Sequence, residues 1–333
     1  MLTWRRRLLT PSHDETRLAT RGFHVKDAAA KEVLETVGAR FLDGFGEAVG
    51  TRTVAELEEY LETVPTRFRG FAAEGAAMGL AVLDALPMVR SGRVDTFLGG
   101  RGRDHVYMAL VGVGWAMARL PRLLWPRPDR FDPLLRWLVL DGYGFHQAYF
   151  HTDDWVHGDR RRPVLDWARD DAAYEGRAID QGIGRALWFV AGTDARRAAD
   201  LVDAYPEHRR ADLWGGIGLA ATYAGGATTE ELEHLVTRSG PYRADLAQGS
   251  AFAAEARLRA GLEVPHVGAA TAVLAGTDPV TAARVCEDTR PVDGADGAER
   301  PGEPAYETWR RHIGQALTTG RLTAPTAPTG GAR

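Results

Sequence analysis

Apolar residues along the chain recur mostly at intervals of three and four, and the period-two alternation typical of β-strands is scarce. Val33, Val37 and Phe41, for example, fall on one stripe of a helix, and Thr53 with Glu56 forms a capping box that begins another helix. Helices are predicted over residues 25–45, 53–64, 68–86 and 105–120, and from about residue 134. The pattern predicts an all-α fold.

A short glycine pattern recurs in the second half of the chain. Gln181-Gly-Ile-Gly184 is echoed by Gly215-Gly-Ile-Gly218, and more loosely by Gln248-Gly-Ser-Ala. Gly182 and Gly216 are 34 residues apart, and Gly216 and Gly249 are 33 apart. This is the period of tetratricopeptide-like helix pairs, although the tetratricopeptide consensus is not matched. We therefore expect stacked helical hairpins in an α-solenoid-like array with a repeat of about 34 residues.

The same glycines resemble nucleotide-binding loops only weakly, because none of them follows a strand. Helix packing explains them better, since small residues let two backbones approach closely. That gain must outweigh the roughly 1 kcal/mol that each glycine costs inside a helix. Gly112-Val-Gly114 and Gly142-Tyr-Gly144 are interpreted as earlier, degenerate members of the pattern.

The pattern divides the chain into three regions. Residues 1–20 form an N-terminal arm, and residues 21–287 form the helical-repeat domain. Residues 288–333 form a C-terminal region with a Pro- and Gly-rich linker, a short helix over residues 306–317 and a disordered tail.

Composition narrows the classes of partner. The 333 residues carry a formal net charge of −4 with a pI near 6.2, which argues against nucleic acid or a general anionic membrane surface. Cys286 is the single cysteine, which excludes an intrachain disulfide and a cysteine-based zinc site. The longest apolar run, residues 106–118, is shorter than the roughly 20 residues that cross a bilayer, and no signal peptide precedes it. We expect a soluble cytoplasmic protein without a membrane span.

Histidines and aspartates are densest just after residue 145. His151, Asp153, Asp154 and His157 are side chains of the kind that bind Zn²⁺, Fe²⁺ or Mg²⁺, and they form a predicted site for a divalent metal. Asp153 and His157 would share one face of a helix, but the spacing matches no established metal motif. Two alternatives are metal-free acid/base chemistry, together with His146, and a polar helix end without any chemical role.

A second group of charged residues follows Tyr174. Glu175, Arg177, Asp180 and Arg185 alternate in sign, so Asp180 could lie between the two arginines. A buried aspartate with neighbouring arginine and tyrosine could protonate or orient a substrate. The alternative is a network of salt bridges between helices.

Paired acids offer a third possibility. Asp153-Asp154 and Asp170-Asp171 are similar to the Asp-rich segments that hold Mg²⁺-diphosphate in terpene synthases, and an all-α cavity would suit a terpene-cyclase-like enzyme. Adjacent residues of a helix do not face the same way, however, and no second diphosphate motif follows.

Four segments resemble an UnbL-like family of bacterial proteins found in enediyne biosynthetic gene clusters, beside the polyketide synthase. The segments are Arg21–Lys26, Val64–Ala76, Asp141–Phe150 and Tyr174–Phe189. The resemblance implies an accessory role in enediyne or polyketide natural-product biosynthesis. It also implies a hydrophobic polyene or enediyne-type ligand and biosynthetic partner proteins. It supplies no catalytic residues.

Together, these observations favour an enzyme that matures a hydrophobic polyene by acid/base chemistry. The alternatives are a non-catalytic binding or scaffold protein, or one that sequesters a toxic product for self-resistance. The candidate catalytic residues are His146, His151, Asp154, His157, Tyr174, Asp180 and Arg185. An enzyme predicts that His146, Asp154, Tyr174 and Asp180 converge on one closed pocket, whereas a scaffold predicts that they are scattered or solvated.

Overall fold

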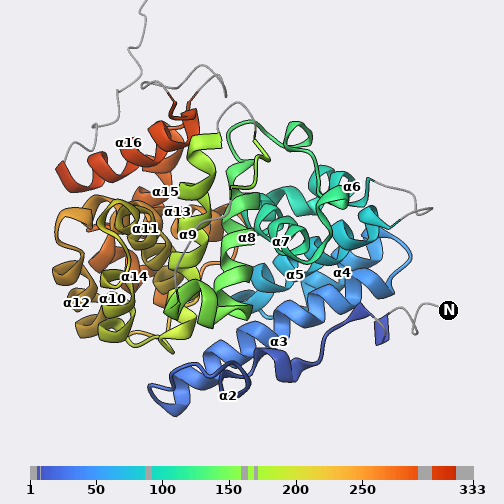
Figure 1. Cartoon of the computed structure of the whole chain (residues 1–333), viewed down its shortest axis with the longest axis horizontal. Coiled ribbons are helices and arrows are strands. Elements are labelled where there is room, and N and C mark those ends of the chain that lie inside the picture. Colours follow the sequence, from blue (N-terminus) through green and yellow to red (C-terminus); the bar gives the residue numbers. More distant parts are fainter. Residues whose placement is uncertain are drawn as a thin grey trace, which may run out of the picture.

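The computed structural model describes residues 6, 7, 9–86, 92–158, 164–168, 172–291 and 302–319. These residues form helices packed against one another and contain no strand, which confirms the all-α prediction (Figure 1). The helices predicted over residues 25–45, 53–64, 68–86 and 105–120 correspond to α3, α4, α5 and α7.

The α-helices are α2 (Leu18–Arg21), α3 (Ala28–Gly50), α4 (Val54–Thr63), α5 (Thr66–Ala85), α6 (Arg93–Gly99), α7 (Val106–Arg119), α8 (Trp137–Phe150), α9 (Ala172–Val190), α10 (Ala195–Asp203), α11 (Glu207–Tyr223), α12 (Thr229–Ser239), α13 (Arg243–Arg259), α14 (Pro265–Leu274), α15 (Pro279–Asp288) and α16 (Ala305–Thr319). Short 3₁₀ turns include η1 (His13–Thr16) and η3 (Arg122–Leu124), and η5 (Asp153–His157) is a π-helical turn.

The long helices form a row in chain order. Helix α3 packs on α5, α5 on α7, α7 on α8, α8 on α9, α9 on α11 and α11 on α13 (Figure 1). The shorter helices α10, α12 and α14 form a second row beside the C-terminal half, and α15 and α16 both contact α13. Each long helix in the middle of the row is therefore covered on two sides by its neighbours.

Glycines set how closely these helices approach. A Cβ atom on Gly182 would overlap the backbone oxygen of Asp141 on α8, and one on Gly184 would overlap that of Leu213 on α11. One glycine of each pair thus meets the preceding helix and the other meets the following helix. The same backbone contacts occur at Gly112, Gly114, Gly142, Gly144, Gly216 and Gly218. Helix packing, as predicted, explains the glycine pairs.

The glycine contacts do not by themselves establish the predicted repeat of about 34 residues. Helix pairs with a short second helix follow one another from α9 to α14, whereas α7 and α8 are joined by a segment with only 3₁₀ turns. The 34-residue repeat therefore stays a prediction.

The first and last described elements of the chain pack on this core. Turn η1 packs on α3, where Thr16 is buried, and α16 matches the short helix predicted over residues 306–317. The Trp309 indole of α16 is buried and donates a hydrogen bond to the Cys286 carbonyl, 2.8 Å away. The tail was predicted over residues 318–333; residues 318 and 319 belong to α16, and the rest lies outside the described residues. No helix in the described ranges is long and apolar enough to span a membrane.

A matched pair of glycine substitutions tests the close approach. Gly182→Ala is expected to lower the free energy of unfolding by about 3 kcal/mol, because its Cβ would overlap the Asp141 backbone, which cannot move without shifting α8. Gly268→Ala in α14, where a Cβ meets nothing within 4 Å, is expected to raise stability by roughly 0.5–1 kcal/mol. Urea denaturation measures both. Equal stability of the two variants would contradict the packing argument.

Candidate functional site

Three charged side chains meet in the middle of the helix row. Arg185 of α9 binds the Asp141 carboxylate of α8 through Nη1, and its Nη2 lies 3.9 Å from Oε1 of Glu74 on α5. All three residues are buried, with Glu74 only 1% exposed. The guanidinium also lies 4.9 Å from the centre of the Phe145 ring. We call Glu74, Asp141 and Arg185 the central cluster.

The glycine contacts bring this cluster together. Gly112 of α7 packs on the backbone oxygen of Glu74, and Gly182 of α9 packs on that of Asp141. Because these helices are so close, side chains from α5, α8 and α9 can reach one another around α7. The cluster is therefore a direct consequence of the small residues in the row.

The cluster contains two carboxyls and one guanidinium, and this imbalance shows in the pKa values. Burial raises the pKa of Glu74 to about 7, against the lowering influence of Arg185, and nearby Asp141 raises it further. Burial also raises the pKa of Asp141, partly offset by its ion pair with Arg185. Oε1 of Glu74 has no hydrogen-bond partner among the described residues. Glu74 can therefore gain or lose a proton near neutral pH.

A small cavity lies against each side of the cluster. Glu74 lines a cavity of about 40 Å³. Its other lining residues include Phe41, Phe71, Trp115, Phe145, Phe150 and Phe189. Arg185 lines a second cavity of about 30 Å³, with Tyr107, Tyr223 and Phe252. The hydroxyl of Tyr223 has no hydrogen-bond partner among the described residues. The cluster is thus an ionisable centre inside an aromatic interior.

His146 of α8 packs against Trp115, one of the residues that line the first cavity. It is buried, and its ring stands edge to face with Trp115 at 5.5 Å between centroids. Burial lowers the pKa of His146 to about 3, with a contribution from Arg119. The imidazole is therefore neutral at physiological pH, and its Nδ1 has no hydrogen-bond partner in the described part of the chain.

The other members of the histidine and aspartate group lie on the surface. His151, Asp153, Asp154 and His157 are exposed at the end of α8 and along the π-helical turn η5. Among the residues that the structure describes, no group of three or more His, Cys, Asp or Glu side chains could hold a metal ion. The predicted divalent-metal site therefore has no geometric support. The placement agrees with the alternative of a polar helix end.

The structure also gives no support to the similarity with the Asp-rich segments of terpene synthases. Asp153 and Asp154 are both exposed. The second pair, Asp170-Asp171, lies outside the described residues.

Tyr174 belongs to a different buried network. Its hydroxyl donates to Glu307 of α16 at 2.7 Å, and Arg177 binds both Glu307 and Asp212 of α11. Arg310 of α16 also binds Asp212, at 2.8 Å. The two arginines outweigh the cost of burial and hold the pKa of Asp212 below its usual value. This network fastens α16 to α9 and α11.

Asp180 has yet another partner. Both of its carboxylate oxygens accept hydrogen bonds from Arg209 of α11, and both residues are buried. The prediction that Asp180 lies between Arg177 and Arg185 is wrong, because those arginines bind Asp212 and Asp141 instead. The alternative, a network of salt bridges between helices, is confirmed.

The expected convergence of His146, Asp154, Tyr174 and Asp180 on one closed pocket is therefore wrong. Asp154 is solvated, and Tyr174 and Asp180 belong to separate buried networks. Of the seven candidate residues, Arg185 alone belongs to the central cluster, and it lines the second cavity.

Sequence reasoning missed Glu74 and Asp141. Both lie in segments that carry the family resemblance, and each is one residue away from a glycine of the helix contacts. An acidic residue beside a packing glycine in the middle of an apolar helix was the available signal, because a lone buried charge needs a partner from another helix.

A comparison with protein-family models matches residues 1–317 to a family described as proteins of unknown function. The chain belongs to the DUF1702 family. Comparisons with curated proteins and with solved structures found no match. The central cluster of this DUF1702 protein lies wholly within the matched residues.

The Asp180–Arg209 pair can be tested as a structural element. Asp180→Asn is expected to lower the free energy of unfolding by about 3–5 kcal/mol, because it leaves the Arg209 charge buried without a carboxylate. Asp180→Leu combined with Arg209→Met should recover much of that loss. Urea denaturation gives these values, and Asp154→Asn on the exposed turn is a control expected to change stability by less than about 0.5 kcal/mol. An Asp180→Asn variant as stable as the control would contradict the assignment.

Proposed function

We propose that this protein is an enzyme that moves a proton on a hydrophobic, conjugated small molecule, with Glu74 as the acid/base group. One observation carries the proposal. Glu74 is a fully buried carboxyl whose pKa is raised to about 7, and it lines an aromatic cavity with its Oε1 3.9 Å from the Arg185 guanidinium. A perturbed carboxyl in an apolar cavity is a typical candidate for general acid/base catalysis.

Arg185 and Asp141 have a positioning role in this proposal. Arg185 is held by Asp141, so its second nitrogen can balance the charge of Glu74 whenever the carboxyl loses its proton. The carboxylate accepts a proton from one carbon of the ligand and returns a proton to another. The double bonds shift and the composition does not change, so this step requires no oxidant and no reductant.

The ligand class rests on the lining and on the family resemblance. Aromatic rings favour a flat, apolar, conjugated molecule, and the resemblance to proteins of enediyne biosynthetic gene clusters suggests a polyene precursor. Cavities of about 40 and 30 Å³ are too small for such a molecule, so binding has to widen them. Thr16 lines the larger cavity from the short turn η1.

The alternative is a protein that binds or sequesters the same ligand without changing it. The aromatic lining favours this reading as much as it favours catalysis. The two differ in whether the proton of Glu74 reaches the ligand.

Deuterium exchange distinguishes them. A conjugated polyene ketone is incubated with the intact protein in D₂O, and deuterium on its carbons is followed by mass spectrometry. Glu74→Gln is expected to slow exchange by about 100-fold or more, while binding of parinaric acid, followed by its fluorescence, persists. Glu255→Gln is the control, because Glu255 is also buried with a raised pKa but is paired with Arg259.

Equal exchange by wild type and Glu74→Gln would contradict the proposal. Binding by the wild-type protein without any exchange would favour the sequestration alternative.

The pH dependence of stability gives an independent test of the Glu74 pKa. A folded-state pKa raised from 4.5 to about 7 contributes stability that is fully present below pH 4.5 and is lost as the pH rises to about 7. The stability of Glu74→Gln relative to wild type should therefore increase by about 3 kcal/mol between acidic and slightly alkaline pH. Urea denaturation across this range measures the difference. A difference that does not change with pH would show that the pKa of Glu74 is not raised.

A further inference from the structure

Large hydrophobic side chains are exposed mainly on two loops. Leu123, on turn η3 between α7 and α8, is 93% exposed, and its neighbour Leu124 is 38% exposed. Val164, in the segment between η5 and α9, is 84% exposed. In the described part of the chain, the other large hydrophobic residues of this kind are Val25 and Val280, which lie on other elements. Single exposed apolar residues are ordinary, but a group of them marks an interaction site.

The two loops are fastened to each other. Arg122 donates from its guanidinium to the carbonyl of Leu165, and the Trp167 indole donates to the carbonyl of Pro126 at 2.7 Å. Leu123 and Val164 therefore lie on adjoining loops.

Val164 is held outward by its neighbours. Leu165 and Trp167 are buried, and the Glu175 carboxylate of α9 accepts hydrogen bonds from the backbone nitrogens of Asp166, Trp167 and Ala168. The exposure of Val164 is thus imposed by the packing of the residues that follow it.

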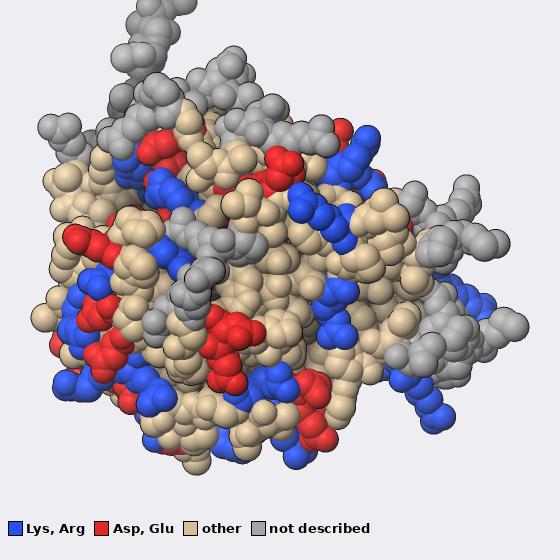
Figure 2. All heavy atoms as spheres, in the orientation of Figure 1, with Lys and Arg blue, Asp and Glu red and all other residues tan. Residues whose placement is uncertain are grey.

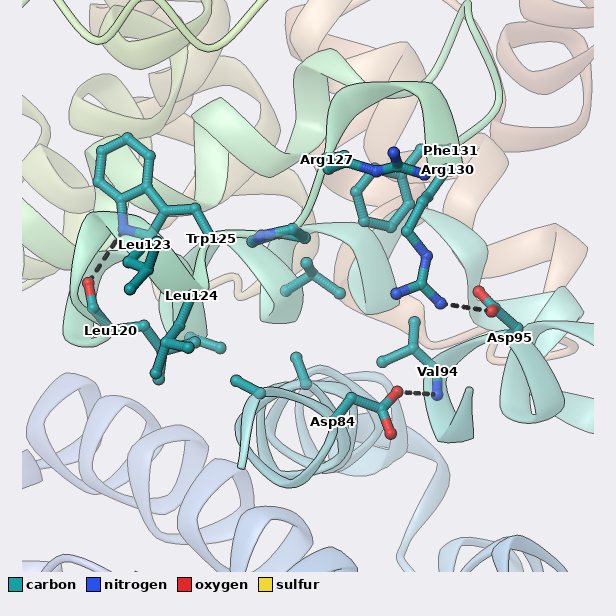
Figure 3. Close-up of a pocket in the computed structure, with 15 residues that line it drawn as sticks. Asp84, Val94, Asp95, Leu120, Leu123, Leu124, Trp125, Arg127, Arg130 and Phe131 are labelled. Carbon is teal, nitrogen blue, oxygen red and sulfur yellow. Dashed lines mark hydrogen bonds and ion pairs between the residues drawn. The ribbon is translucent and has the colours of Figure 1, made fainter. Parts of the chain in front are cut away.

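A groove lined by both apolar and charged side chains lies beside Leu123. It has a volume of about 430 Å³ and is lined by α5, α6, α7 and the loop after α7 (Figure 3). Figure 3 shows Leu123, Leu124 and Trp125 on one side of the groove and Arg127, Arg130 and Phe131 on the other. We call Leu123, Leu124, Val164 and this groove the apolar edge.

Arginines and aspartates both lie at the apolar edge. The loop over residues 119–133 contains the exposed residues Arg119, Arg122, Arg127 and Arg130 against two aspartates, so its formal charge is positive while that of the chain is −4. Part of this charge is balanced, because Arg130 pairs with Asp95 of α6 at 2.6 Å and Arg127 lies 3.5 Å from Asp129. The Arg127 side chain is 76% exposed. Acidic and basic side chains are interspersed over the face drawn in Figure 2. The net charge of the chain therefore does not argue against an anionic surface at this one place.

We propose that the apolar edge docks the protein on the surface of an anionic phospholipid bilayer. Leu123, Leu124 and Val164 enter the apolar layer, Trp125 lies at the depth of the headgroups, and the arginines contact lipid phosphates. Hydrophobic tips that project from loops suit a fluid lipid layer, which closes around them. A protein partner would have to supply a separate hollow for each tip.

Vesicle sedimentation of the full chain tests this proposal. Wild-type protein is expected to bind vesicles made of equal parts phosphatidylcholine and phosphatidylglycerol, and to bind phosphatidylcholine alone much more weakly. Leu123→Ser with Val164→Ser is expected to reduce binding about tenfold or more. Val280→Ser, which changes a half-exposed valine of α15, is the matched control and should bind as wild type does.

A charge variant gives a second measure. Arg127→Gln is expected to weaken binding to the anionic vesicles about fivefold, and added salt should weaken binding of the wild type. Arg196→Gln, on the exposed first turn of α10, is the control.

Two results would overturn the proposal. One is that the wild-type protein does not sediment with the anionic vesicles, or that the Leu123→Ser, Val164→Ser double variant sediments with them equally well. The other is that sedimentation velocity without lipid detects self-association that this double variant abolishes, since the apolar edge would then be an interface between copies of the chain.

Discussion

The contact of glycine with the backbone of the neighbouring helix is the constraint on which the rest of the structure depends. Gly142 packs on the Val111 carbonyl and Gly144 on the Ile179 carbonyl, so α8 is held closely between α7 and α9. Each glycine weakens its own helix, and the close approach of the whole row has to compensate for that loss. The same closeness lets side chains from helices that are not neighbours in the row meet in its interior, and it leaves little water there to solvate them.

The buried charges differ in how well they are balanced. Asp180 is matched by Arg209, and Asp212 is held between Arg177 and Arg310. These groups are ion-paired and hydrogen-bonded between helices, as expected of structural ion pairs. The central cluster has one guanidinium for Glu74 and Asp141, and burial raises the pKa of both carboxyls against its influence. That difference, rather than burial itself, separates a candidate reactive site from scaffolding.

The sequence predicted those parts of the structure that depend on local spacing. The stripe at Val33, Val37 and Phe41 lies on α3, and the capping box of Thr53 with Glu56 begins α4. The meeting of Glu74 with Arg185 could not be predicted, because the two residues are brought together by the order of the helices in the row. Conversely, the dense histidines and aspartates of residues 151–157 suggested chemistry because they are close in sequence. On the π-helical turn, that closeness places them together in solvent.

The interruption of the regular helix pairs explains where the surface is left uncovered. From α9 onward, the shorter helices α10, α12 and α14 join the long helices and cover them with a second row. Between α7 and α8, prolines at residues 121, 126, 128 and 133 prevent such a helix, and the connection is a loop with short turns. Leu120, Trp125 and Phe131 of this loop still pack partly against the core, but Leu123 does not. Leu123 is exposed at the place where the pattern of paired helices is interrupted. A group of exposed apolar side chains of this kind is typical of a surface that binds a partner.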